Sequence, residues 1–170
     1  MSLNTLKSKL GMGARSNKYR IIMSGIQDAS LDTIKIDTLA KSTIIPQKSF
    51  HEIEIWDRGR QTIIAGDTDF SGTWSVTFMD SQDHSLRKSF LSWMDFMDDV
   101  LTNSRGAIDH NSYMTEVKLQ ILSTIDNSVT CEYILNDVWI KSISDSNLAD
   151  DNSDLLEFTV EFNYSSWVLV

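Results

Sequence analysis

Three histidines and one cysteine are the residues of this 170-residue chain best suited to metal binding or nucleophilic chemistry. His51, His84 and His110 lie far apart, and none has a companion at the short spacing that zinc sites use. Cys131 falls at an apolar position of a strand-like pattern, which favours a small buried side chain over a nucleophile. A single cysteine also excludes a disulfide framework. We therefore expect no metal site and no catalytic cysteine.

Other short motifs that could support chemistry are incomplete. No serine lies in a G-x-S-x-G motif, and the Ser-His neighbours in the chain have no identifiable orienting acid. Asp67 and Asp69 resemble the start of a calcium loop, but the ligands at its fifth and twelfth positions are missing. Gly11 and Gly13 lack the third glycine, the preceding strand and the lysine of nucleotide-binding loops. The sequence thus predicts a protein that is not an enzyme and needs no cofactor.

The charge of the chain is unevenly distributed. Residues 1–20 contain five basic and no acidic side chains and so carry a charge of +5. Because the whole chain carries −9, the remaining 150 residues carry −14. Such an acidic surface repels nucleic acid, because DNA binding depends on Lys and Arg displacing counterions. The acidity is compatible with a wall along which DNA slides and equally with simple solubility. No apolar run reaches the roughly 18 residues that span a bilayer, and no secretory signal is visible, so we expect synthesis in a cytoplasm.

Periodicity predicts a strand followed by an amphipathic helix in the middle of the chain. Alternate residues are apolar in Thr73–Phe78, which is typical of a strand with one buried face. From Leu86 to Met97 the apolar residues recur every three or four positions, which is helical spacing. The turn-rich segment Asp57-Arg58-Gly59 predicts a hairpin with a three-residue loop between Ser49–Trp56 and Arg60–Ala65. The remaining expected strands are Lys18–Met23, Thr33–Ala40, Thr115–Ile125, Val129–Leu135, Val138–Ile143 and 156–164, with a loop at Thr102–Ser112 and an acidic loop at Asp145–Asp154.

These elements predict an α+β, mainly β fold: an antiparallel β-sandwich or barrel with one flanking α-helix. No repeat or proline-rich linker divides the chain, whose only proline is Pro46. We expect residues 1–17 to form a flexible basic N-terminal arm and residues 18–170 to form a single β domain.

Several segments resemble the tail tube proteins of contractile-tailed bacteriophages. They are the motif AGD at residues 65–67, WSVTFMD at 74–80, the helix LRKSFLSW at 86–93, the strand start at 14–21 and the closing strand at 157–164. The resemblance implies a structural virion protein: six subunits close a ring, rings stack into the inner tail tube, and DNA is ejected through the tube without specific binding. It also implies contacts with the tail sheath, baseplate, tail terminator and tape-measure proteins, and a location in the virion after synthesis in the host cytoplasm.

The candidate site residues are contact residues and not catalytic ones. The resemblance implies that the hairpin tip, with Trp56, Asp57, Arg58, Gly59, Arg60 and Gln61, touches the next ring. Arg15 and Lys18 are candidates for contacts between subunits, opposite acidic side chains of a neighbour. Considered alone, the charged tip could equally be a solvated turn of little energetic weight.

Other functions stay open on the sequence. Within the same family the chain could be the tube-initiator or baseplate ring, or the tube of a related contractile injection system. In a different class, a monomeric β-sandwich ligand-binding module could use exposed Trp56, Trp139 or Trp167.

Overall fold

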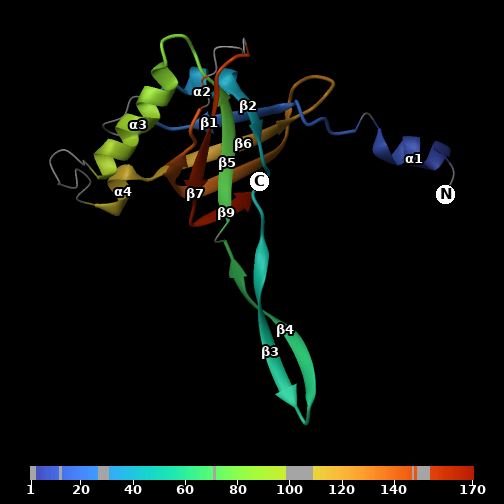
Figure 1. Ribbon diagram of the computed structural model, residues 1–170. Coiled ribbons are helices and arrows are strands. Elements are labelled where there is room, and N and C mark those ends of the chain that lie inside the picture. The colour runs from blue at the N-terminus through green and yellow to red at the C-terminus, as the bar shows by residue number, and fades with distance from the viewer. Residues whose placement is uncertain are drawn as a thin grey trace.

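The fold is mainly antiparallel β, as the sequence predicts (Figure 1). The computed structural model describes residues 3–11, 13–26, 31–70, 72–98, 109–146, 148 and 154–170. The elements in these residues are, in chain order, α1 (Leu3–Leu10), β1 (Tyr19–Met23), α2 (Thr33–Leu39), β2 (Ala40–Thr43), β3 (Ser49–Asp57), β4 (Arg60–Asp69), β5 (Thr73–Met79), α3 (Ser85–Met97), α4 (His110–Tyr113), β6 (Thr115–Leu122), β7 (Val129–Ile143), β8 (Glu157–Asn163) and β9 (Ser166–Leu169).

Strand β7 connects the two halves of the main sheet. The strand order is β1-β6-β7-β8-β5-β2, and β9 also pairs with β7. The first part of β7, up to Val138, pairs with β6, whereas its last residues, Trp139–Ile143, pair with β8. Between these parts the register with β6 shifts, and Asp137 adopts a φ of 56°. This irregularity joins the strands predicted separately at Val129–Leu135 and Val138–Ile143 into one strand that serves two sheet halves.

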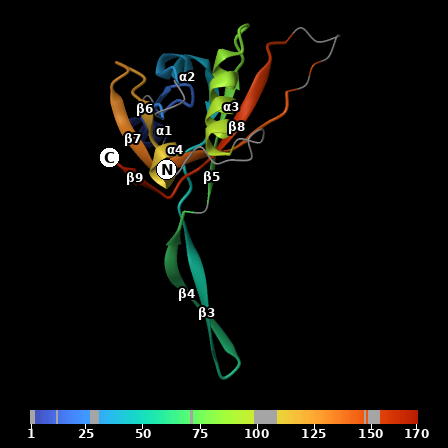
Figure 2. The same cartoon turned by 90° about the vertical axis from the view of Figure 1, so that its left-hand side faces the viewer.

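The core forms where α3 lies against β5 and β8 (Figure 2). The Phe90 ring lies 5.3 Å from that of Phe78 and 6.3 Å from that of Phe158, and Trp93 lies 6.4 Å from Phe162. These side chains are fully buried. The alternation expected in β5 and β8 and the helical spacing expected in α3 are confirmed, because each apolar face points into this cluster.

The strand predicted at Thr33–Ala40 is wrong, since residues 33–39 form helix α2. The Asp32 carboxylate accepts hydrogen bonds from the backbone N–H groups of Ile34 and Lys35, which caps the helix start. Only Ile36 of α2 is buried, and Ile34 is 77% exposed. The alternating isoleucines therefore do not mark a two-sided strand, and capping outweighs the β-branched composition.

Several smaller expectations also change. The loop predicted at Thr102–Ser112 contains the start of helix α4, and its residues 102–108 lie outside the described part of the chain. Strand β9 was not predicted. The expected basic arm contains helix α1, none of whose residues is buried. Its flexibility stays a prediction, as does the division at residue 17. Most of the acidic loop at 145–154 lies outside the described residues.

Phe90 and its neighbour Leu91 test the importance of the aromatic cluster. Replacing buried Phe90 by Ala should lower the free energy of unfolding by about 3–5 kcal/mol, because it removes ring contacts with two strands and leaves a cavity. Exposed Leu91→Ala is the matched control and should change it by less than about 0.5 kcal/mol. Urea unfolding followed by circular dichroism measures both, and equal losses would contradict the proposed core.

Candidate assembly interface

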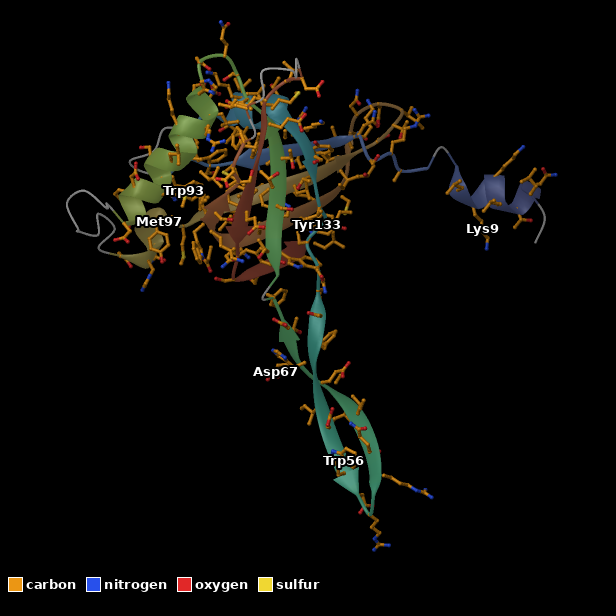
Figure 3. The ribbon with its side chains drawn as sticks, viewed as in Figure 1. Lys9, Trp56, Asp67, Trp93, Met97 and Tyr133 are labelled. Carbon is orange, nitrogen blue, oxygen red and sulfur yellow. The ribbon has the colours of Figure 1, made fainter. Side chains whose placement is uncertain are left out.

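Strands β3 and β4 form a hairpin that projects from the body of the protein (Figures 1 and 3). Among the described strands, these two pair only with each other and make a separate two-stranded sheet. All residues from 50 to 65 are exposed. A hairpin of two strands has no core of its own and is at best marginally stable alone in water. Its surface is therefore available for contacts outside the subunit.

The hairpin tip is a two-residue turn, so the predicted three-residue loop is wrong. Asp57 pairs directly with Arg60, and the turn residues Arg58 and Gly59 have φ values of 46° and 81°. Positive φ at both central positions matches the twist of the flanking strands. Gly59 adopts a positive φ without strain, whereas at Arg58 the Cβ atom makes the same backbone conformation less favourable. The tip thus presents the Arg58 guanidinium at the end of the projection.

The two faces of the hairpin differ in chemistry. Paired residues share a face, which places Ile53, Ile55, Thr62 and Ile64 on one side, here called the isoleucine face. The opposite side, here called the mixed face, has Glu52, Glu54, Trp56, Gln61, Ile63 and Ala65. Large apolar side chains are exposed on both faces, and Trp56 is 63% exposed. A free monomer rarely leaves such a patch in water, so both faces indicate an interface.

A bulge near the root of the hairpin constrains its path. The register of β3 and β4 shifts between Phe50 and Glu52, where Gly66 and Asp67 of β4 oppose His51 alone. A Cβ added to Gly66 would lie 2.9 Å from the His51 carbonyl oxygen, closer than real Cβ contacts allow. Glycine at this position lets the two backbones approach, and the strands cross close to Asp67 in Figure 3.

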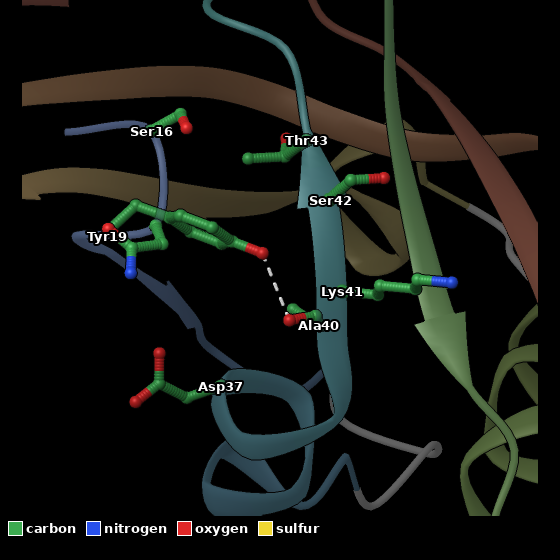
Figure 4. Close-up of a pocket in the computed structure, with 8 residues that line it drawn as sticks. Ser16, Tyr19, Asp37, Ala40, Lys41, Ser42 and Thr43 are labelled. Atoms are coloured by element: carbon green, nitrogen blue, oxygen red, sulfur yellow. Dashed lines mark hydrogen bonds between the residues drawn. The ribbon is translucent and has the colours of Figure 1, made fainter.

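A second candidate surface lies on the body, between the start of β1 and strand β2 (Figure 4). Two adjoining cavities of about 450 and 240 Å³ share Ser16, Tyr19 and Thr43 as lining residues, and we call them together the edge groove. The Tyr19 hydroxyl donates a hydrogen bond of 3.0 Å to the Ala40 carbonyl. Burial, assisted by the nearby Asp37 carboxylate, raises the pKa of the Tyr19 hydroxyl. The smaller cavity is apolar, and its lining includes Ile44, Ile45, Leu119 and Ile121.

The structure separates the predicted contact residues into two groups. Arg15 and Lys18 line the edge groove, and the Lys18 ammonium donates to the Asn127 side chain at 2.7 Å. The residues from Trp56 to Gln61 lie at the far end of the hairpin. The two groups do not meet within one subunit. The sequence analysis missed the exposed pair Ile44 and Ile45, although two isoleucines beside the only proline were a usable signal.

Other residues considered in the sequence lie apart. His51 is on β3, His84 precedes α3 with its Nδ1 2.7 Å from Asp80 Oδ2, and His110 begins α4. Trp139 and Trp167 are half-buried, and the Trp167 indole N–H donates to the Gln47 carbonyl. Trp56 is the most exposed of the three tryptophans that a ligand-binding surface would use. Among the described helices, none has the length and apolarity needed to cross a membrane.

Gly66 gives a test of the hairpin geometry. Gly66→Ala should disturb the bulge, because the added Cβ meets a backbone oxygen that cannot rotate away. The amides of β3 and β4 should then exchange with deuterium faster, while those of β5 and β8 keep their protection. The control Ala65→Ser changes the neighbouring exposed residue, where an extra atom points into solvent. Unchanged exchange in Gly66→Ala would contradict the tight approach.

Comparison with known proteins identifies the family of this chain. A family model for phage tail tube proteins matches residues 7–170. Among solved structures, the sheath/tube terminator of the PVC extracellular contractile injection system has a TM-score of 0.65 at 8% identity, covering 92% of this chain and 95% of that one. The PVC sheath-tube complex gives 0.64 at 9% identity over 100% and 98%, and the baseplate of the anti-feeding prophage gives 0.65 at 14% over 92% and 95%.

These structural similarities support the tail-tube-like, mainly β fold. The search of curated proteins found no match to the sequence. The family model covers nearly the whole chain, including the strand start, the hairpin, the strand–helix junction and the closing strand. The chain therefore belongs to the phage tail tube protein family.

Proposed function

We propose that copies of this chain form hexameric rings, which stack into the inner tube of a contractile phage tail. In this proposal the protein is a conduit for DNA ejection and performs no chemical step. Membership of the tail tube family supports a structural role in a tube.

The observation that carries the proposal is the exposed hairpin. Its strands make no sheet contact with the body, yet six large apolar side chains along it lie in water in a single subunit. Covering them with other copies would bury apolar surface and order a two-stranded sheet that is marginal alone. Interfaces of obligate assemblies commonly exceed about 2,000 Å² and are apolar. An assembly built from identical subunits supplies such cover at every hairpin.

The proposed partners follow from the place of a tube within a tail. Other copies of the chain come first, and the sheath, terminator and baseplate proteins would contact the outside and the ends of the tube. The tape-measure protein would occupy the lumen. The charge of −14 carried by residues 21–170 would repel DNA from the wall and leave it free to slide. We place the protein in the virion, after synthesis in the host cytoplasm.

A second position within the same machine is a terminator or tube-initiator ring. The similarity to a PVC terminator and to a sheath-tube complex is nearly equal, with TM-scores of 0.65 and 0.64, so the fold does not separate these positions. The monomeric ligand-binding module has less support, because Trp139 and Trp167 are half-buried within the fold. The main tube is the proposal that we pursue.

Arg58→Glu tests the role of the hairpin tip. Reversing the charge at the end of the projection should leave the subunit folded, since Arg58 is exposed in the hairpin turn, yet it should shorten or abolish tubes. Arg58→Lys is the control, because it retains the positive charge on a long side chain. Negative-stain electron microscopy at high protein concentration measures tube length. Tubes of normal length with Arg58→Glu would refute this role of the tip.

A further inference from the structure

We infer that the edge groove of one copy receives the mixed face of the hairpin from a neighbouring copy, with Trp56 in the apolar end of the groove. This inference rests on the proposed function, in that the partner is a second copy of the chain. It adds the surface that the hairpin contacts, which the assembly proposal leaves open. The two surfaces match in three respects: an open sheet edge, an apolar lining and unpaired charges.

The edge groove lies along an open edge of the main sheet. The sheet ends with β1 on one side and β2 on the other. Helix α2 covers the β1 edge, because the Asp37 carboxylate accepts a hydrogen bond from the Ile21 N–H at 3.0 Å. Strand β2 pairs only with β5, and its other side faces the edge groove. An uncovered strand edge is a ready site for another chain.

The apolar end of the edge groove is open to solvent in the part of the subunit that the structure describes. Ile44 and Ile45 in its wall are 50% and 57% exposed, and Leu119 and Ile121 line the same cavity. The hairpin of the same subunit cannot provide that cover, since it points away from the body in both views (Figures 1 and 2). Trp56 is a large apolar side chain that lies in water at the end of the projection, so it could fill such an open cavity. A tryptophan seated in an apolar pocket is a common anchor of protein interfaces.

Charge selects the mixed face over the isoleucine face. In the described residues neither Arg15 nor Lys18 forms a salt bridge, although both line the edge groove. Glu52 and Glu54 lie on the mixed face, and within the same described ranges they too have no ion-pair partner. At the tip end of the isoleucine face, Asp57 lies opposite Arg60 as its cross-strand partner, so that end of the face carries no net charge. The basic groove and the acidic, tryptophan-bearing face are therefore complementary.

Disulfide trapping between copies tests this contact. In a Cys131→Ser background, Ile45→Cys protein is mixed with Trp56→Cys protein, left to assemble and oxidised. A disulfide needs Cβ atoms about 3.5–4.5 Å apart, so it reports a direct contact. The control is Ile55→Cys, one residue away on the isoleucine face. We expect about fivefold more cross-linked heterodimer with Trp56→Cys than with Ile55→Cys, since adjacent strand residues point to opposite sides.

Three outcomes of the trapping would overturn the inference. Equal or greater trapping of Ile55→Cys would mean that the isoleucine face occupies the edge groove. Leu6→Cys protein, mixed with Ile45→Cys protein in the same way, is a further arm, because Leu6 is exposed on the apolar side of helix α1. Preferential trapping in this arm would mean that helix α1 of another copy fills the edge groove. Wild-type tubes seen by microscopy without trapping at Trp56 would refute the inference and leave the proposed function intact. Wild-type protein that never forms rings or tubes would refute the proposed function itself.

A charge exchange gives a second test that keeps Trp56 in place. Lys18→Glu and Glu54→Lys should each reduce assembly, because each variant brings like charges together at the contact. The double variant restores opposite charges and should recover most of the wild-type assembly, as measured by the sedimenting fraction. Circular dichroism of each variant shows whether the subunit is folded. Folded single variants whose losses simply add in the double variant would contradict a direct pairing.

Discussion

The hairpin of β3 and β4 exposes apolar side chains and has no core of its own. Hydrogen bonds between β3 and β4 satisfy the inner edges of the hairpin, but they leave its outer edges and both faces in water. The apolar side chains on both faces cannot fold back onto the body, since the hairpin projects away from it. Exposed apolar surface of this kind is typical of an interface, and in the proposed assembly another copy of the same chain covers it.

The body of the protein provides a firm base for this projection. The segment between β2 and β3 is held by two indole groups, because Trp74 donates to the Ile44 carbonyl at 2.9 Å and Trp167 donates to the Gln47 carbonyl at 3.0 Å. Trp74 is fully buried and packs 5.3 Å from Phe162. The aromatic core below α3 is thereby connected to the root of the hairpin. A contact that depends on the direction of the hairpin needs such a root, because an ordered interface loses less entropy on assembly.

Sequence reasoning reached the elements whose patterns report burial directly. Alternation around Trp74 and Phe158 and helical spacing around Phe90 predicted β5, β8 and α3, because each has one face in the core. It failed at Thr33–Ala40, because this segment has the alternating sequence pattern of a strand but forms a helix capped by Asp32. The hairpin was predicted, but its detachment was not, since exposed Ile53 and buried Val76 have the same alternating pattern. The edge groove could not be predicted, because it joins residues 14–19 to 40–45 only after folding.

In the proposed assembly, the hairpin is completed by other copies of the chain. Hydrogen–deuterium exchange of the wild-type protein tests it most directly, by comparing the amides of residues 49–69 in dilute monomer and in concentrated assembly. The account predicts that these amides become strongly protected on assembly, together with those of the edge groove at residues 40–45, while the amides of β5 and β8 are protected in both states. Equal, rapid exchange of the hairpin at both concentrations would contradict it.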